Sequence, residues 1–192
     1  MNIDGVVLAG GASSRMGDHK PLIPFRGATL IEAVIARARP QVQRLKIDVP
    51  KAMADAYRAR FGDIVLADAF DENLGPLCGI VTGLEWTAAE WLATFPCDTP
   101  FLPLDVVAQL ARHANDRPVV AKGAQVFGLW PKRCLTELRT GLESGALRSV
   151  LSAVDVLGGK ACELQTSENA FFNINTPDDL QEAERLFRLP SP

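Results

Sequence analysis

The sequence predicts a mixed α/β fold in which a mainly parallel sheet lies between two layers of helices. Short apolar runs alternate along the chain with segments whose apolar residues recur at helical spacing, and this alternation is typical of parallel sheets covered on both faces. The length of 192 residues and the hydrophobic content of 47% suit one domain with its own core. We therefore expect a single domain over residues 1–192.

The first half of the chain predicts strands and helices in turn. Residues 5–8 form a short apolar run that ends at a glycine pair. Residues 29–38 carry apolar side chains at helical spacing, with Thr29 as the expected cap and Glu32 completing a capping box. After them we expect a strand at 45–49, a helix at 52–60, a strand at 64–67, a Gly/Pro-rich turn at 74–79, a helix at 80–87 and a strand at 91–95.

The second half is less regular. Pro103 is expected to open a helix, because proline is common at the first helical position. A final helix should begin after Thr176, with Pro177 at its first position and Asp178 and Asp179 at the positive end of its dipole. The other elements are expected at 118–121, 124–130 and 161–164 for strands and at 132–142 and 147–154 for helices.

Composition excludes several classes of protein. The formal net charge of −3 argues against a general nucleic-acid binder, which usually presents a basic field. The four cysteines form no Cys-x-x-Cys pair, and in a chain with this much core we read them as reduced and intracellular. No apolar run approaches the roughly 18 residues that span a bilayer, and the first residues lack the features of a signal peptide. We expect a cytoplasmic protein with no membrane or nucleic-acid partner.

Three of the four clearest strands end in residues that can bind a ligand. They end at Gly10-Gly11, at Asp68 and at Asp98. In open parallel sheets, ligands bind beyond the carboxyl ends of the strands. We therefore expect these residues to converge on one crevice.

The loop over residues 8–20 has the character of a phosphate-binding loop. It follows a strand and is rich in glycine and small residues, so that backbone N–H groups can approach phosphate oxygens. Arg15 offers a fork of donors and Lys20 a point charge. It is neither a P-loop, because Gly17 is followed by Asp18, nor a Gly-x-Gly-x-x-Gly fingerprint.

Four stretches together resemble the molybdenum cofactor guanylyltransferases, nucleotidyltransferases with a Rossmann-like sheet. They cover nearly the whole chain and lie at residues 8–20, 75–79, 96–101 and 172–180. The resemblance implies a three-layer αβα nucleotidyltransferase fold, with a nucleotide-binding half over about residues 1–100 and an acceptor-binding half over about residues 101–192.

The same resemblance implies the roles of individual residues. The nucleotide is expected to contact the backbone of Leu8, Ala9, Gly10 and Gly11, the side chain of Lys20 at its triphosphate, and the pocket residue Asp68. Asp98 is expected to bind both the nucleotide and Mg²⁺, and Arg15, Lys20 and Asp98 are expected to be catalytic. The pterin substrate is expected to contact Asn173 and Asn175.

Elementary chemistry supports some of these roles more than others. Magnesium prefers oxygen ligands and usually takes one or two carboxylates together with substrate phosphates. Asp98 follows a hydrophobic strand, where a carboxylate has no packing purpose. Asp68 has an alternative role as a turn residue. Asn173 and Asn175 share one face of an extended segment, although asparagine is also common before a helix.

The sequence departs from the family near the end of its second strand. The family commonly carries an asparagine there that helps to hold the nucleotide. Residues 47–51 contain none, so either Asp48 or Lys51 takes its place or the contact is missing. The sequence therefore does not show which residue would contact the base here, whereas the expected binding of the phosphates does not depend on this position.

The expected reaction is transfer of GMP from GTP to the molybdenum-bound molybdopterin, with release of pyrophosphate. A phosphate oxygen of the pterin attacks the α-phosphorus, and the protein supplies positioning and charge neutralisation. The nucleophile is already an anion, so no strong general base is required. Molybdoenzymes or their chaperones are the expected recipients of the product.

Three other functions remain open. A CTP-dependent molybdopterin cytidylyltransferase would use the same chemistry, but such relatives tend to have Leu-Ala-Ala-Gly, and a Cβ at Gly10 would crowd the base pocket. A sugar-phosphate or polyol-phosphate nucleotidyltransferase would share only the first loop, and the stretches at 96–101 and 173–180 speak against it. A non-catalytic nucleotide- or pterin-binding relative would explain the missing asparagine.

Overall fold

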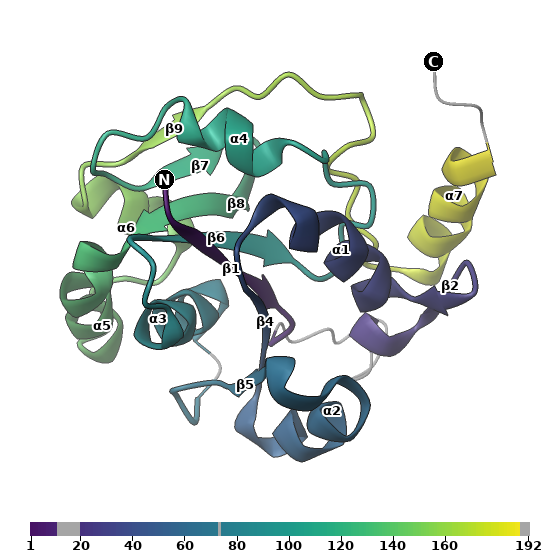
Figure 1. Cartoon of the computed structure of the whole chain (residues 1–192), viewed down its shortest axis with the longest axis horizontal. Helices are drawn as coiled ribbons and strands as arrows, with labels where there is room; N and C mark the ends of the chain where they lie inside the picture. The colour runs from purple at the N-terminus through teal and green to yellow at the C-terminus, as the bar shows by residue number, and fades with distance from the viewer. Residues whose placement is uncertain (11–19, 73, 189–192) are drawn as a thin grey trace.

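The computed structural model describes residues 1–10, 20–72 and 74–188. Its centre is a seven-stranded sheet in the order β5-β4-β1-β6-β8-β7-β9 (Figure 1). Strand β8 runs antiparallel to both of its neighbours, and the other pairings in this sheet are parallel. The strands are β1 (Ile3–Leu8), β4 (Leu45–Val49), β5 (Val65–Ala67), β6 (Trp91–Pro96), β7 (Val119–Ala121), β8 (Ala124–Pro131) and β9 (Lys160–Cys162).

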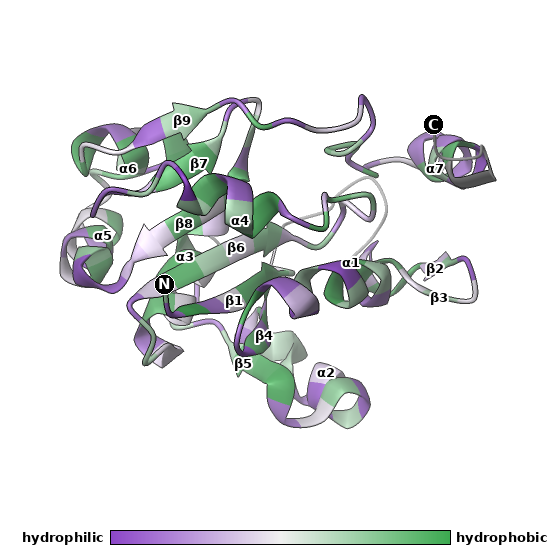
Figure 2. Ribbon diagram, turned by 45° about the horizontal axis from the view of Figure 1, so that its top comes forward, coloured by the Kyte–Doolittle hydropathy of each residue, from purple (hydrophilic) through white to green (hydrophobic). Residues whose placement is uncertain are grey.

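Helices cover both faces of this sheet, which confirms the predicted three-layer α/β class. One hydrophobic cluster joins the sheet to α1 (Leu30–Ala38), α2 (Ala54–Phe61) and α4 (Val106–Ala111). A second cluster joins the opposite face to α3 (Pro76–Trp86), α5 (Leu135–Glu143) and α6 (Val150–Val156). Figure 2 shows β7 as hydrophobic along its length, as expected for a strand whose residues are all buried.

The expected caps at two helix starts are present. The Glu32 carboxylate accepts hydrogen bonds from the backbone N–H and the hydroxyl of Thr29, both at 2.7 Å. At the start of α7 (Pro177–Arg188), the Thr176 hydroxyl accepts from the Asp179 N–H at 3.1 Å, and the Asp179 carboxylate accepts from the Thr176 N–H at 2.8 Å. Each reciprocal pair satisfies backbone donors that the first helical turn leaves open.

Helices α3 and α4 begin at different residues from those predicted. Helix α3 begins at Pro76 and not at residue 80, because Gly75 has a φ of +83° and turns the chain so that Pro76 takes the first helical position. Helix α4 begins at Val106 and not at Pro103. The carbonyls of Leu102 and Pro103 instead accept side-chain hydrogen bonds from the neighbouring helix layer, which hold this stretch outside the helix.

The last third of the chain shows two further shifts of this kind. Helix α5 begins at Leu135 and not at residue 132, because residues Lys132–Cys134 form a 3-10 turn before it. Helix α6 begins at Val150, three residues later than expected. The Ser149 hydroxyl accepts from the Ser152 N–H at 3.1 Å, and Ser149 therefore caps the helix at that point.

A small hairpin and the last helix pack together outside the main layers. Strands β2 (Pro24–Phe25) and β3 (Ala28–Thr29) pair in an antiparallel hairpin that the sequence did not predict. Phe25 joins Ile174 and Ala183 in a separate hydrophobic cluster, so α7 lies beside the hairpin (Figure 1). The Ile174 N–H donates to the Asp98 carbonyl at 2.9 Å. This contact brings the segment before α7 next to the end of β6.

All four cysteines are buried and carry free thiols. Within residues 1–10, 20–72 and 74–188, no helix combines the length and the apolar character that crossing a membrane requires.

Close packing between α3 and the sheet predicts the effect of one substitution. A Cβ at Gly79 would lie 2.4 Å from Asp48 Oδ2 and 2.7 Å from Leu8 Cδ2. We expect Gly79→Ala to lower the free energy of unfolding by about 1–3 kcal/mol, the usual cost of overpacking a core, as measured by urea denaturation. Gly10→Ala is the matched control, because its Cβ would lie 3.8 Å from the same carboxylate, an ordinary contact. Equal stability of the two variants would contradict this description.

Candidate functional site

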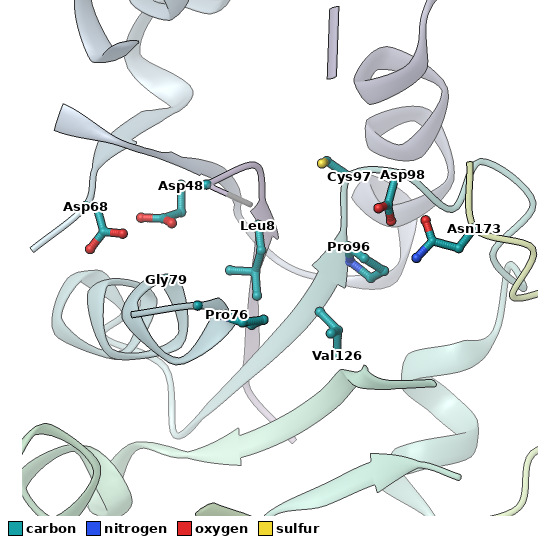
Figure 3. A pocket seen from close by; sticks show the side chains of 12 residues that line it. Leu8, Asp48, Asp68, Pro76, Gly79, Pro96, Cys97, Asp98, Val126 and Asn173 are labelled. Atoms are coloured by element: carbon teal, nitrogen blue, oxygen red, sulfur yellow. The ribbon is translucent and has the colours of Figure 1, made fainter. Parts of the chain in front are cut away.

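One cavity of about 150 Å³ lies where the carboxyl ends of the parallel strands meet. Figure 3 shows Asp48 and Asp68 on one side of Leu8 and Cys97, Asp98 and Asn173 on the other. The predicted convergence of Gly10, Asp68 and Asp98 on one crevice is thereby confirmed. Residues 11–19 of the glycine loop lie outside the described residues. The cavity is lined by Leu8, Gly10, Asp48, Asp68, Gly75, Pro76, Gly79, Pro96, Cys97, Asp98, Val126 and Asn173.

The register of three strands explains why these side chains meet. Leu8 at the end of β1 lies opposite Asp48 of β4 on one side and Pro96 of β6 on the other. The ladder continues past the strand ends, because the Ala9 N–H donates to the Asp48 carbonyl at 2.9 Å and the Cys97 N–H to the Leu8 carbonyl at 3.3 Å. Residues that follow the strands are therefore held at the same edge.

The side chain of Lys20 forms an ion pair with Asp98 and a hydrogen bond with Asn175. Its ammonium lies 2.6 Å from Asp98 Oδ2 and 2.7 Å from Asn175 Oδ1, and only 6% of the residue is exposed. A buried ammonium needs such partners to offset the loss of water. Asn175 thus contacts Lys20 and is not among the cavity-lining residues, whereas Asn173 is.

Two further carboxyl groups are buried on the opposite side of the cavity. Asp48 is 1% exposed, and its Oδ1 has no hydrogen-bond partner among the described residues. Burial, and secondly the charge of Asp68, raise the pKa of Asp48 well above its usual value. Burial also raises the pKa of Asp68, although the Phe70 N–H at 3.0 Å and the Thr82 hydroxyl at 3.3 Å oppose this shift.

The structure distinguishes the two residues that the sequence left open near the second strand. Asp48 lines the cavity, while the Lys51 ammonium pairs with exposed Asp71 at 2.7 Å and does not line it. The signal in the sequence was a carboxylate at the penultimate position of a predicted strand whose other residues, apart from Lys46, are apolar. An unpaired buried carboxyl group facing a cavity is a candidate ligand-binding group.

Some predicted site residues lie outside the described part of the chain. Gly11 and Arg15 belong to residues 11–19, so their expected roles in nucleotide binding and catalysis stay predictions. Among the others, Leu8 and Gly10 line the cavity, and Ala9 is buried next to them.

The carboxylate of Asp98 is an oxygen donor of the kind that divalent metal ions take. Asp98 presents a carboxylate to the cavity, with the Thr99 hydroxyl 3.4 Å from its Oδ1. No group of three or more His, Cys, Asp or Glu side chains within the described residues could hold a metal ion by itself. Magnesium usually requires only one or two carboxylates, because substrate phosphates and water complete its shell.

Comparisons with known proteins point to one family. The model of the MobA-like NTP transferase domain matches residues 5–157. The molybdenum cofactor guanylyltransferase of Mesorhizobium japonicum is 40% identical, covering 97% of this chain and 97% of the relative. That of Rhodopseudomonas palustris is 39% identical, covering 94% of this chain and 92% of the relative.

Solved structures share the fold. Molybdopterin-guanine dinucleotide biosynthesis protein A from Archaeoglobus fulgidus has a TM-score of 0.82 at 23% identity, covering 96% of this chain and 98% of that one. The 2-C-methyl-D-erythritol 4-phosphate cytidylyltransferase from Thermus thermophilus has a TM-score of 0.71 at 17% identity, covering 96% and 98%. These neighbours confirm the expected nucleotidyltransferase fold.

The buried carboxyl group of Asp48 predicts a pH-dependent stability. Because its pKa is raised in the folded chain, the folded chain keeps a proton that the unfolded chain releases above about pH 4. The free energy of unfolding therefore falls as pH rises from about 4 to the pKa of the folded state. Asp48→Asn removes the titrating carboxyl group and with it this loss of stability, so it should raise the melting temperature at pH 7 by a few degrees. In a chain of this size, a gain of about 1 kcal/mol in the free energy of unfolding corresponds to about 2–4 °C.

Thermal melts between pH 4 and pH 8 measure this effect. The advantage of Asp48→Asn should shrink towards pH 4, and Asp63→Asn at an exposed position is the matched control. An advantage that does not change with pH would show that Asp48 titrates normally in the folded protein.

Proposed function

Because this chain belongs to the MobA-like NTP transferase family, we propose that it transfers GMP from GTP to molybdenum-bound molybdopterin and releases pyrophosphate. The chain is a nucleotidyltransferase by family. The observation that carries the specific proposal is the cavity at the carboxyl ends of β1, β4 and β6, with Lys20 paired to Asp98 at 2.6 Å beside it. A catalytic carboxylate and an adjacent buried ammonium favour an enzyme over a non-catalytic binding protein.

The guanine base is proposed to bind at Asp48. An ionised carboxyl group there can accept two hydrogen bonds, from N1–H and from the 2-amino group of guanine, and these donors favour the charged form. Cytosine and adenine present a ring acceptor beside their amino group, which a carboxylate repels. A Cβ at Gly10 would point to within 3.8 Å of Asp48 and Pro50, which is consistent with Gly10 leaving room for the base.

The triphosphate is proposed to lie between the glycine loop and Asp98. Magnesium bound by Asp98 would neutralise phosphate charge and stabilise the charge that develops on the leaving pyrophosphate. Lys20 would donate to a phosphate oxygen, and Asn175, at 2.7 Å from the ammonium, would keep it oriented. The acceptor phosphate attacks as an anion, so the chain need not supply a general base.

The acceptor is proposed to approach from the side of Asn173, which lines the cavity next to Asp98 (Figure 3). We propose that the nucleotide binds to the half formed by about residues 1–100 and the pterin to the half formed by about residues 101–192. We further propose that the reaction takes place in the cytoplasm and that the product passes to molybdoenzymes or their chaperones.

The role of Asp98 predicts a loss of turnover without loss of the fold. Asp98→Asn keeps the shape of the side chain but removes its charge, and kcat for pyrophosphate release from GTP with magnesium and molybdopterin should fall at least about 100-fold. Circular dichroism verifies folding, and Asp155→Asn on the exposed face of α6 is the control. Turnover that survives in Asp98→Asn would exclude Asp98 as the metal ligand.

The role of Asp48 predicts the nucleotide preference. With GTP, CTP and ATP compared in parallel, the wild type should release pyrophosphate from GTP alone. Asp48→Leu should lose about tenfold or more in kcat/KM for GTP through the missing hydrogen bonds, while Asp48→Asn, which keeps an acceptor oxygen, should lose less. Release from CTP by the wild type would keep the mechanism but overturn the roles of Gly10 and Asp48. No release from any nucleotide by folded protein would favour a non-catalytic function.

A further inference from the structure

The hydroxyl of Thr82 is buried in the middle of α3. Thr82 is 6% exposed, and the other buried residues of this helix are hydrophobic or glycine. Valine would fill nearly the same space, and a buried hydroxyl costs free energy unless it finds hydrogen-bond partners. The partners of this hydroxyl therefore indicate what a polar side chain contributes at this position.

Thr82 is joined to both the side chain and the backbone of the segment that carries Asp68. Its Oγ1 accepts a hydrogen bond from the Ala69 N–H at 2.9 Å. The hydroxyl has one hydrogen to donate, and two acceptors lie within reach, the Cys78 carbonyl at 3.0 Å and Asp68 Oδ1 at 3.3 Å. An ionised carboxylate is the stronger acceptor of the two, so a charged Asp68 attracts this hydrogen.

The contacts of Asp68 occupy one oxygen of its carboxyl group. The Phe70 N–H donates to Oδ1 at 3.0 Å, as the Thr82 hydroxyl does, and two donors on one oxygen fix the rotation of the carboxyl group. Asp68 lines the cavity, and its Oδ2 receives no hydrogen bond from the described part of the chain. This second oxygen is therefore available to a donor group of a ligand.

The place of Asp68 in the cavity indicates which part of a nucleotide it would meet. Asp68 lies on the opposite side of Leu8 from Asp98 (Figure 3). With the triphosphate at Asp98, as proposed above, Asp68 faces the nucleoside, whose hydroxyl and amino groups are donors that a carboxylate accepts. A change at Asp68 should therefore alter nucleotide affinity and leave the transfer step unaffected.

We propose that Thr82 is a positioning residue for nucleotide binding, because its hydroxyl holds the Asp68 carboxylate in the orientation that presents Oδ2 to the nucleoside. Thr82 is not among the residues that line the cavity, so it acts through Asp68 and does not touch the nucleotide. This inference rests on the proposed function, from which it takes the nucleotide in the cavity.

Isothermal titration calorimetry with GTP and magnesium, without an acceptor, tests this role. Thr82→Val keeps the shape of the side chain but removes its hydroxyl, and it should raise the Kd of GTP about fivefold, the usual effect of one hydrogen bond. Thr82→Ser keeps the hydroxyl and should leave the Kd within about twofold, although the missing methyl group lowers the melting temperature. In both variants kcat at saturating GTP should stay within about twofold of the wild type.

Thr87→Val is the matched control for lost stability. Thr87 lies at the other end of α3, where its hydroxyl donates to the buried carboxylate of Asp4 at 2.6 Å and accepts from the Ala89 N–H at 3.0 Å. The variant removes the same two kinds of hydrogen bond away from the cavity, so it should lower the melting temperature without changing the Kd of GTP. A comparable loss of affinity in Thr87→Val would overturn the inference, because lost stability alone would then explain the effect.

A double-mutant cycle tests whether Thr82 acts through Asp68. Asp68→Ala should itself weaken GTP, and adding Thr82→Val to it should change the Kd by less than about twofold, since the two residues share one contact. Additive losses would overturn the inference, as would equal affinities of Thr82→Val and the wild type, or a Thr82→Ser variant as weak as Thr82→Val.

The binding measurements separate this inference from the proposed function. A wild type that binds GTP with the expected pattern of variants but transfers no GMP would contradict the proposed function and still support the role of Thr82. A wild type that binds no GTP would overturn both.

Discussion

The parallel pairing of β1 with β4 and β6 is the constraint on which the site depends. Leu8 lies opposite both Asp48 and Pro96, so the chain emerges from all three strands at one edge of the sheet. Helix α3 packs against this edge so closely that Gly79 leaves no room for a Cβ beside Asp48. The same packing removes Asp48 from water and raises its pKa. The site is therefore built at a cost in stability, which a bound base with two donors would offset.

Charge is distributed unevenly around this edge. Asp98 has its counter-charge within the fold, because Lys20 lies 2.6 Å away and Asn175 accepts a second hydrogen bond from it. The Ile174 N–H donates to the Asp98 carbonyl, so the segment before α7 secures both Asn175 and the end of β6.

Local signals in the sequence predicted most elements but not all of their ends. The capping boxes at Thr29 and Thr176 depend on residues three apart, and both are present. Pro103 carried an equally local signal, yet α4 begins at Val106 because side chains of a neighbouring segment bind the carbonyls of Leu102 and Pro103. Such competition between distant groups cannot be read from spacing alone.

The sequence by itself determined the α/β class and the convergence of Gly10, Asp68 and Asp98, because strand–helix alternation and the direction of parallel strands follow from local pattern. It also indicated the family, through the resemblance of its four motif stretches. Only the tertiary structure showed that Asp48 lines the cavity and Lys51 does not, and that Asn173 lines it while Asn175 contacts Lys20. These choices depend on which side chains become buried and paired across long stretches of chain, as in the contact between Lys20 and Asn175. Hydrophobic periodicity carries no information about such pairs, whose geometry arises only when the sheet, α3 and the segment before α7 pack together.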